Sequence, residues 1–480
     1  MSATLSEVID AVDGRPVGTA VDRALAITGA TNDSRAVQPG WLYCCVPGAN
    51  VDGHDFAPAA VDAGATALLV ERPLDLDVAQ VEVAYVRASM GPAAAAVEGH
   101  PSDALTVLGV TGTNGKSSVV QILADIWEKA GIRTDQFGTL TGARTTPEAP
   151  ELQRRLRASS DTGTGAVAME VSSHALDMYR VAGTQFAAVI FTNLSRDHLD
   201  YHGTMEAYFE AKSQLFTADY SPVAVVNVDD DYGVRLAASL LDRPGIDLHP
   251  YEMEHAEDLV IDGPRSHFVW RGRPVTLHLA GRHNVANALA AATTAAALGL
   301  DLDTIADALC ATSPVRGRFE MIDVGQPFAV AIDYAHTPDA LDAVLEAADQ
   351  ASAGRVIVVF GCGGDRDQDK RPMMGEVAQR RSDLAIVTTD NPRGEDPLAI
   401  IDDVLSGTTW TGGEAPGAAS ADVRVEPDRR AAIAAALAEA RAGDIVVIAG
   451  KGHETVQEVG SCRTEFDDRQ VALEELGALT

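Results

Sequence analysis

The sequence has no long apolar run, no secretory signal and few cysteines. No apolar stretch approaches the roughly 20 residues that a membrane-spanning helix needs, and residues 1–13 lack the basic and apolar regions of a signal peptide. The five cysteines are odd in number and are not spaced as metal ligands. We therefore expect a cytoplasmic protein that makes no contact with a membrane and keeps its thiols free or buried.

Basic residues are also scarce. The 480-residue chain carries 37 Lys and Arg against 70 Asp and Glu, a formal net charge of -33. Because such an acidic surface repels phosphate backbones, we predict no nucleic-acid partner. Anionic small substrates remain compatible with this charge where Arg, Lys, metal ions or helix N-termini offset the field locally. We expect the chain to act as a monomer.

Strand-like and helix-like stretches alternate along most of the chain, which is typical of α/β domains with parallel sheets. We predict three domains, at 1–102, 103–316 and 317–480. Nearly continuous apolar runs in the third indicate strands buried on both faces. The predicted elements are strands at 41–46, 67–70, 105–110, 167–171, 187–192, 223–227, 329–333, 355–360, 384–388 and 445–449, a hairpin around Gly272 and a helix over 284–298.

A glycine-containing loop lies between a strand and a helix. Residues 111–118 read Thr-Gly-Thr-Asn-Gly-Lys-Ser-Ser, and the apolar residues at 119, 122, 123, 126 and 127 share one helical face. A helix N-terminus in this position can hold phosphate oxygens. Lys116 would reach the β- and γ-phosphates, and the Ser117 hydroxyl would face Mg²⁺. The usual spacing would have glycine in place of Val110, so the loop is a variant of the general P-loop pattern. A purely structural turn is the alternative.

Polar residues follow the next two strands. Glu170 ends one apolar strand, and His198 comes shortly after another. The carboxyl ends of parallel strands share the edge at which α/β proteins bind ligands. Ser117, Glu170 and His198 could therefore converge on Mg²⁺, although Glu170 alone could equally be a cap or an ion-pair partner. Lys212, in a helical stretch, is interpreted from the residues alone as an ordinary solvated lysine.

Ordered motifs along nearly the whole chain resemble the Mur ligase family, ATP-dependent enzymes that build the peptidoglycan stem peptide. The most specific segments are 33–35, 111–118, 170–174, 192–203, 208–216, 317–320, 333–336, 361–375, 390–393 and 450–454. Within the family, the chain is most similar to enzymes that add the third amino acid to UDP-N-acetylmuramoyl-L-alanyl-D-glutamate. The resemblance implies an α/β protein of three domains: an N-terminal UDP-binding domain, a central P-loop domain with a parallel sheet, and a C-terminal Rossmann-like domain that binds the amino acid.

The family's reaction fits the residues. ATP phosphorylates the terminal carboxylate of the substrate, and the amine of the incoming amino acid attacks the acyl phosphate to give an amide, ADP and phosphate. Two anions meet in this reaction, so cations must screen them. The resemblance implies catalytic roles for Lys116, Glu170, His198 and Lys212. It also implies that Mg²⁺ is held by Ser117, Glu170, His198 and Lys212, the last as N6-carboxylysine.

The resemblance also implies three sets of binding residues. The ATP set is Gly112, Thr113, Asn114, Gly115, Lys116, Ser117, Ser118, Asn287, Arg318 and Asp333. The set for the UDP-muramoyl dipeptide is Ser34, Ala49, Asn50, Val51, Thr145, Thr146, Ser172 and Arg180. The set for the diamino acid is Arg366, Asp390, Asn391, Pro392, Arg393, Gly450 and Glu454.

Residues 390–393, Asp-Asn-Pro-Arg, match the family motif of enzymes that select meso-2,6-diaminopimelate. Arg393 and Arg366 could bind its distal carboxylate, while Asp390 or Glu454 could bind its distal amine. L-Lysine or another diamino acid is the alternative substrate, and Arg393 could also be an exposed loop arginine without a role. A folate polyglutamylase and a non-catalytic nucleotide-binding paralogue are the competing functions.

Several positions depart from the family pattern. Ser117 and Ser118 replace the commoner pair of threonines but keep the hydroxyl groups, so the expected metal role stands. An arginine, Arg144, replaces a common asparagine, and Met178 replaces a polar residue near Arg180. Asp369 replaces a glycine, and His283 replaces an aromatic residue on the adenine side. We expect these departures to affect individual substrate contacts but not the class of reaction.

Overall fold

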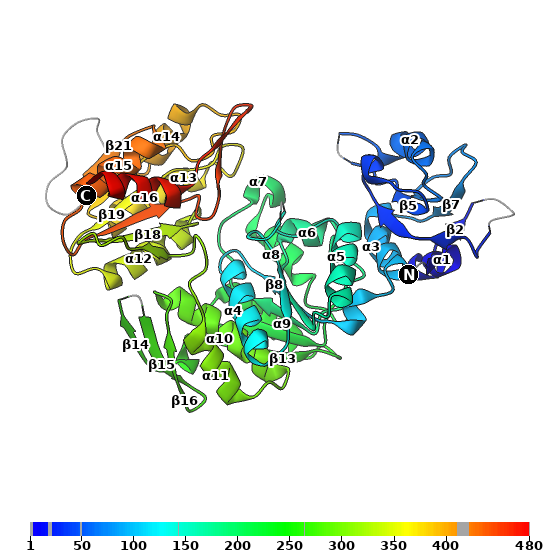
Figure 1. Cartoon of the computed structure of the whole chain (residues 1–480), viewed down its shortest axis with the longest axis horizontal. Coiled ribbons are helices and arrows are strands. Elements are labelled where there is room, and N and C mark those ends of the chain that lie inside the picture. Colours follow the sequence, from blue (N-terminus) through cyan, green and yellow to red (C-terminus); the bar gives the residue numbers. More distant parts are fainter. Residues whose placement is uncertain are drawn as a thin grey trace.

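The computed structural model describes residues 3–17, 22–48, 50–142, 144–263, 265–409 and 422–479. Three sheets of five or six strands follow one another along the described chain, and the three parts they organise lie in a row (Figure 1). The N-terminal part and the C-terminal part are at opposite ends of this row. None of the described helices is both long and apolar enough to cross a bilayer.

The N-terminal sheet has five strands in the order β2-β7-β6-β5-β4, in which β4 to β7 run parallel. Its strands are β2 (Arg15–Pro16), β4 (Gly29–Thr31), β5 (Trp41–Cys44), β6 (Ala67–Val70) and β7 (Ala79–Glu82); β1 (Ala3–Thr4) pairs with β3 (Ala26–Ile27). Its helices are α1 (Leu5–Val12), α2 (Ala57–Asp62) and α3 (Val86–Val97), with 3-10 turns η1 (Ser34–Ala36), η2 (Gly53–Phe56) and η3 (Pro101–Ala104). Apolar residues pack on both faces of this sheet.

The central sheet has six parallel strands in the order β13-β12-β11-β8-β10-β9. They are β8 (Thr106–Thr111), β9 (Thr134–Phe137), β10 (Ala166–Glu170), β11 (Ala188–Phe191), β12 (Val223–Asn227) and β13 (Asp247–Tyr251). A smaller antiparallel sheet contains β14 (Glu257–Asp262), β15 (Arg265–Trp270) and β16 (Arg273–Leu277), and η4 (Met253–His255) precedes it. The turn at Gly272 joins β15 to β16, so the predicted hairpin is confirmed.

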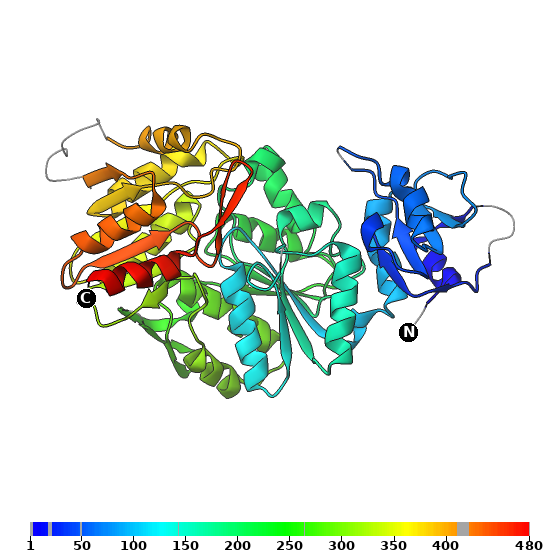
Figure 2. The same cartoon turned by 45° about the horizontal axis from the view of Figure 1, so that its top comes forward.

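Helices cover both faces of the central sheet. They are α4 (Lys116–Lys129), α5 (Ala149–Asp161), α6 (Ser173–Asp177), α7 (Leu199–His202), α8 (Met205–Ser213), α9 (Asp231–Leu240), α10 (Arg282–Ala297) and α11 (Leu302–Ala311). On one face α4 packs with α10, α11 and the small sheet around the buried side chains of Trp127 and Trp270. On the other face α5, α8 and α9 form a second core. Figure 2 shows α4 (cyan) and α5 (teal) on either side of the strands.

The C-terminal sheet has the order β17-β18-β22-β19-β20-β21, and only β17 at the edge is antiparallel. Its strands are β17 (Glu320–Ile322), β18 (Ala329–Asp333), β19 (Val356–Phe360), β20 (Leu384–Val387), β21 (Asp422–Val425) and β22 (Ile445–Ala449), followed by the hairpin β23 (Val456–Val459) and β24 (Cys462–Glu465). Helices α12 (Pro338–Ala351), α13 (Lys370–Arg381) and α14 (Pro397–Leu405) cover one face, and α15 (Arg429–Glu439) and α16 (Asp468–Leu479) cover the other. The predicted α/β fold with parallel central and C-terminal sheets is confirmed.

An ion pair in the core of the C-terminal part joins its last two helices. Arg429 at the start of α15 places Nη2 2.7 Å from Asp468 Oδ2 at the start of α16, and neither side chain is exposed. The same Nη2 donates to the carbonyl oxygen of Ala449, the last residue of β22. The pair therefore fixes both helices to the end of a central strand.

We expect Asp468→Ala to lower the free energy of unfolding by about 3–5 kcal/mol, because it leaves the Arg429 charge buried without a partner. Urea unfolding followed by circular dichroism would measure the loss. Arg430→Ala is the matched control, since Arg430 pairs with Glu474 and Glu475 at the surface of the same two helices. Its loss should be much smaller. An equal loss of unfolding free energy in the two variants would contradict the claim that burial makes the Arg429–Asp468 pair important.

Candidate active site

The loop between β8 and α4 depends on two glycines. Gly112 has φ +148°, and a Cβ added there would lie 1.9 Å from Thr192 Oγ1. Gly115 has φ +87°, and its Cβ would lie 2.4 Å from Asn287 Oδ1. Both positions therefore exclude a side chain on steric grounds, and the backbone N–H groups at the start of α4 stay accessible to a phosphate.

Lys116 is folded back onto this loop. Its Nζ donates to the carbonyl oxygens of Gly112 (3.0 Å) and Thr113 (2.9 Å). Burial lowers the pKa of the Lys116 ammonium, and the nearby Glu170 carboxylate opposes that shift. The side chain is thus already at the loop, where a phosphate would replace backbone carbonyls as its partner.

Ser117 and Glu170 meet as predicted. The Ser117 hydroxyl donates to Glu170 Oε1 at 2.9 Å and accepts from Arg318 Nη2 at 3.0 Å. Glu170 Oε1 also accepts from the backbone N–H of Thr139 at 2.9 Å. A hydroxyl and a carboxylate are the hard oxygen donors that Mg²⁺ prefers, so these residues fit the ion.

His198 lies at the start of α7 with a left-handed backbone, φ +55°. Burial lowers the pKa of His198 to about 3, although the carboxylate of Asp197, 3.3 Å from its Nε2, favours the charged form. The ring is therefore neutral at pH 7 and can act as a ligand. Among the residues the structure describes, no three His, Cys, Asp or Glu side chains are grouped closely enough to hold a metal ion.

The prediction from the residues alone that Lys212 is solvated is wrong. Its side chain is buried, with 1% of the residue exposed. Its Nζ donates to the Gly112 carbonyl at 2.8 Å and lies 4.6 Å from the centre of the Tyr208 ring. Burial, and then the charge of Lys116, hold the pKa of Lys212 well below its ordinary value. Helix α8 packs beneath the phosphate loop, which no spacing within α8 could indicate.

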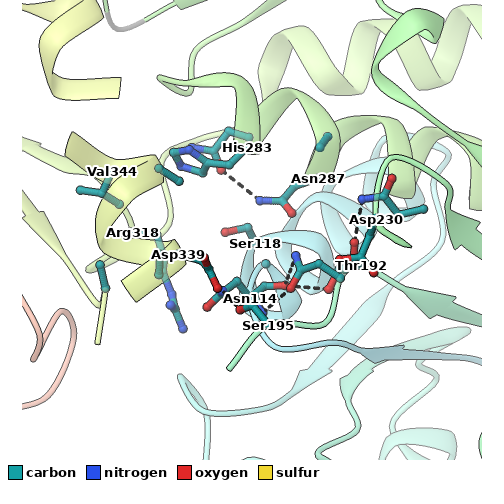
Figure 3. A pocket seen from close by; sticks show the side chains of 18 of the residues that line it. Asn114, Ser118, Thr192, Ser195, Asp230, His283, Asn287, Arg318, Asp339 and Val344 are labelled. Carbon is teal, nitrogen blue, oxygen red and sulfur yellow. Dashed lines mark hydrogen bonds between the residues drawn. The ribbon is translucent and has the colours of Figure 1, made fainter. Parts of the chain in front are cut away.

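A cavity of about 530 Å³ lies between the central and C-terminal parts (Figure 3). Six residues of the predicted ATP set line it: Asn114, Gly115, Ser118, Asn287, Arg318 and Asp333. The remaining four, Gly112, Thr113, Lys116 and Ser117, are not among its lining residues. Sequence reasoning missed Asp230, Asp339 and Val344, the last two on α12. The departure His283 also lines the cavity, next to Asn287 in Figure 3.

Asp333 shapes this cavity through the backbone. Its Oδ1 accepts from the N–H of Ala335 and its Oδ2 from the N–H of Phe319, both at 2.7 Å. Burial raises the pKa of the Asp333 carboxyl. Phe319 follows Arg318, whose guanidinium lies 4.6 Å from the centre of the Tyr334 ring. Asp333 therefore positions Arg318 rather than pointing both oxygens at a ligand.

Four residues predicted for the muramoyl dipeptide lie together. The Thr146 hydroxyl donates to the Glu170 carbonyl (2.9 Å) and accepts from the N–H of Ser172 (3.1 Å), and Arg180 Nη1 donates to the Thr146 carbonyl (3.3 Å). Thr145 precedes them, with its hydroxyl 3.1 Å from that of Thr139. This group therefore adjoins the predicted Mg²⁺ carboxylate.

The other residues of that set are in the N-terminal part. Ser34 follows β4, and Asn50 and Val51 follow β5. Since β4 and β5 are adjacent and parallel, these residues lie beyond the same edge of the N-terminal sheet. Ala49 lies outside the described residues.

Three arginines surround one carboxylate beside Thr146. Glu148 Oε1 is 2.6 Å from Arg144 Nη1 and 3.0 Å from Arg180 Nε, and its Oε2 is 4.0 Å from Arg87 Nη1. The cluster has a net positive charge in a strongly acidic protein, which suits an anionic ligand. The departure Arg144 belongs to it, whereas sequence reasoning missed Arg87 and Glu148.

Three of the seven predicted diamino-acid residues line a second pocket, of about 360 Å³. Asn391, Arg393 and Glu454 line it, together with Gly142 from the central part. Asn391 Nδ2 donates to Glu454 Oε2 at 2.8 Å. The other four predicted residues, Arg366, Asp390, Pro392 and Gly450, are not among its lining residues. Arg366 nevertheless flanks the same glycine, Gly363, as Arg393 does.

Ion pairs join the central and C-terminal parts beside the site. Arg196 contacts Asp367 (3.0 Å) and Asp369 (2.8 Å), and Lys370 Nζ lies 3.5 Å from Asp197 Oδ1. Burial alone would raise the pKa of Asp197, but the His336 contact and the Lys370 charge hold it well below its usual range. The departure Asp369 thus contributes a contact between the two parts.

Known families and relatives match the chain from near one end to near the other. The family models "Mur ligase family, catalytic domain", "Mur ligase middle domain" and "Mur ligase, glutamate ligase domain" match residues 26–108, 110–295 and 317–452. A UDP-N-acetylmuramoyl-L-alanyl-D-glutamate--2,6-diaminopimelate ligase from Streptomyces coelicolor is 42% identical over 95% of this chain and 93% of its own length. The chain belongs to the Mur ligase family. It is therefore an ATP-dependent ligase that forms amide bonds, as the sequence predicted.

Three further comparisons extend this picture. The ligase of the same name from Geobacter metallireducens is 43% identical over 93% of each chain. A solved structure of such a ligase is 31% identical, with a TM-score of 0.69 over 100% of this chain and 99% of its own. A folylpolyglutamate synthase from Mycobacterium tuberculosis has a TM-score of 0.59 at 20% identity, over 76% of this chain and 92% of its own, and shares the fold only.

We expect Arg196→Ala to favour more open arrangements of the C-terminal part, because contacts between domains of one chain are weak enough for a few ion pairs to matter. Small-angle X-ray scattering of the ligand-free enzyme should give a larger radius of gyration. Asp369→Gly should change it less, since the Asp369 side chain is 82% exposed. Arg235→Ala, which breaks a surface pair with Glu206, is the control. An unchanged radius for Arg196→Ala would contradict the expectation.

Proposed function

We propose that this Mur ligase adds meso-2,6-diaminopimelate to UDP-N-acetylmuramoyl-L-alanyl-D-glutamate in peptidoglycan synthesis. The observation that carries the proposal is the pocket where the guanidinium of Arg393 and the carboxylate of Glu454 line one cavity. The distal end of diaminopimelate carries both a carboxylate and an ammonium, so it matches this pair of opposite charges. The distal end of L-lysine has only the ammonium and would offer no carboxylate to Arg393.

The activities of the relatives support the same reaction. The enzymes from Streptomyces coelicolor and Geobacter metallireducens are both called 2,6-diaminopimelate ligases. The arginine cluster around Glu148 lies between the predicted Mg²⁺ carboxylate and the N-terminal part, where it would receive an anionic group of the muramoyl dipeptide. Ser34, Asn50 and Val51 would then hold the UDP end.

Different residues serve different roles in the first step, the phosphorylation of the substrate carboxylate by ATP. Lys116 and the N-terminus of α4 bind the phosphates of ATP, and Arg318 and Asn287 line the nucleotide cavity. Ser117, Glu170 and neutral His198 would hold Mg²⁺, which when bound screens the charges of the carboxylate and the γ-phosphate. Arg180 orients the second substrate beside Glu170. The C-terminal part then presents the amine of the diamino acid.

Lys212 is proposed to act as its carbamate, N6-carboxylysine. Its uncharged amine attacks CO₂, which gives the carbamate anion and one proton. A pKa lowered by burial favours the neutral amine that this reaction needs. The carbamate would turn a buried cation beside Lys116 into an oxygen ligand for Mg²⁺ and remove the repulsion between the two ammonium groups.

We expect Lys212→Ala to lower kcat by about 10²–10³-fold, the loss typical when one electrostatic stabiliser is removed. A small carboxylate in the buffer should restore part of the activity. ADP release would measure both effects, and native mass spectrometry would detect the added CO₂. Lys129→Ala, at the far end of α4, is the control and should leave kcat unchanged. Full activity of Lys212→Ala would refute the role.

The choice of amino acid is tested with ADP release from ATP and the UDP-muramoyl dipeptide, using diaminopimelate and L-lysine in parallel. We expect turnover with diaminopimelate, and a loss in kcat/KM of about 10-fold or more for Arg393→Ala, since the distal carboxylate loses a charged partner. Arg424→Ala, on β21 away from the pocket, is the control. Robust turnover with L-lysine alone would refute the specificity, and no ADP release with any amino acid would favour a non-catalytic paralogue.

A further inference from the structure

A fully buried ammonium group lies directly behind the amino-acid pocket. Lys451 follows β22 with no exposed surface. Its Nζ contacts the Val456 carbonyl at 2.6 Å, Asn391 Oδ1 at 3.3 Å and Glu454 Oε2 at 3.5 Å. These three acceptors match the three donors of an ammonium group. Lys451 itself is not among the residues that line the pocket.

Asn391 is held by the protein on both ends of its amide. Its Oδ1 accepts from Lys451 and from the backbone N–H of Glu458 (3.0 Å), while its Nδ2 donates to Glu454. Only one N–H of the amide remains for a ligand. Asn391, Glu454 and Lys451 therefore form a closed network, and the ammonium is its buried end.

The position of this network links three segments that form the pocket. Asn391 belongs to the loop after β20, Glu454 to the loop after β22, and Val456 begins the hairpin β23–β24. A buried ion pair contributes little to stability on balance, because desolvation offsets the attraction. Stability alone therefore does not explain a buried cation here, whereas all of its contacts fall on pocket-forming segments.

We propose that Lys451 is a positioning residue for the amino-acid substrate, which rests on the proposed function. It fixes Oε2 of Glu454 from behind the pocket, directly and through Asn391. The remaining oxygen, Oε1, accepts only a 3.4 Å contact from the Tyr334 hydroxyl, which leaves it available to an incoming ammonium group. Loss of the Lys451 ammonium would free the Glu454 carboxylate and the 390–393 loop together.

The test is steady-state kinetics of full-length Lys451→Met, which keeps a long side chain but removes the charge. We expect KM for the diamino acid to rise about 10-fold or more, while KM for ATP and for the UDP-muramoyl dipeptide stay within about 2-fold. A merely structural role would lower the active fraction, and hence the apparent kcat, without raising one KM selectively.

Arg355→Met is the matched control for lost stability. Arg355 pairs with Asp444 at 2.8 Å, immediately before β22, so the pair lies at the opposite end of the strand that leads to Lys451. This variant should lower the melting temperature without raising KM for the diamino acid. An equal rise in that KM for both variants would overturn the proposal.

A double-mutant cycle tests the route through Asn391. Asn391→Ala should raise the same KM, and adding Lys451→Met should raise it little further, because both act on Glu454. Fully additive effects would overturn the proposal. Lys451→Gln, which keeps a donor for Val456, is the second variant, and if neither Lys451 variant folds, the role is structural and the proposal is wrong.

Turnover by the wild-type enzyme tests the proposed function independently of the Lys451 variants. Turnover with L-lysine instead of diaminopimelate would refute the proposed substrate, while the effect of Lys451→Met would still be measured on KM for lysine. No turnover with any diamino acid would overturn both proposals.

Discussion

Two buried lysine side chains donate to the same backbone carbonyl, that of Gly112: Lys116 at 3.0 Å and Lys212 at 2.8 Å. One carbonyl cannot balance two ammonium charges. Burial lowers the pKa of both groups, and the charge of Lys116 lowers the pKa of Lys212 further. The site thus has an excess of buried positive charge that an anionic group would stabilise. ATP phosphates supply part of it, and a carbamate on Lys212 would supply the rest.

Other positively charged side chains also cluster near the phosphate loop, although the protein has a formal net charge of -33. Arg87, Arg144 and Arg180 gather on one glutamate, and Arg318 reaches the hydroxyl of Ser117. The acidic surface keeps the rest of the molecule unattractive to anions. Local clusters of cationic side chains, rather than the overall charge, therefore determine where phosphates and carboxylates can bind.

Hydrophobic periodicity and apolar runs predicted the strands and helices well, because the pattern of a buried strand or helix face lies within a short stretch of the sequence. The strands β12, β18 and β22 have the bounds that were expected for them. Lys212 was misjudged from the residues because its burial depends on a loop 100 residues earlier in the chain. Asp339 and Val344 were missed for the same reason, since α12 is distant in the sequence from the central-part residues that line the same nucleotide cavity. Only the family resemblance assigned Lys212 to the catalytic site, and its catalytic role stays a prediction.

The make-up of the proposed amino-acid pocket has an evolutionary consequence. Apart from Gly142, every residue that lines it lies between Asn391 and Arg463, whereas the phosphate loop and Glu170 belong to the central part. Changes in the C-terminal loops can therefore alter which amine is accepted and leave carboxylate activation intact. Such modularity would let one scaffold diversify into ligases for successive residues of a peptide.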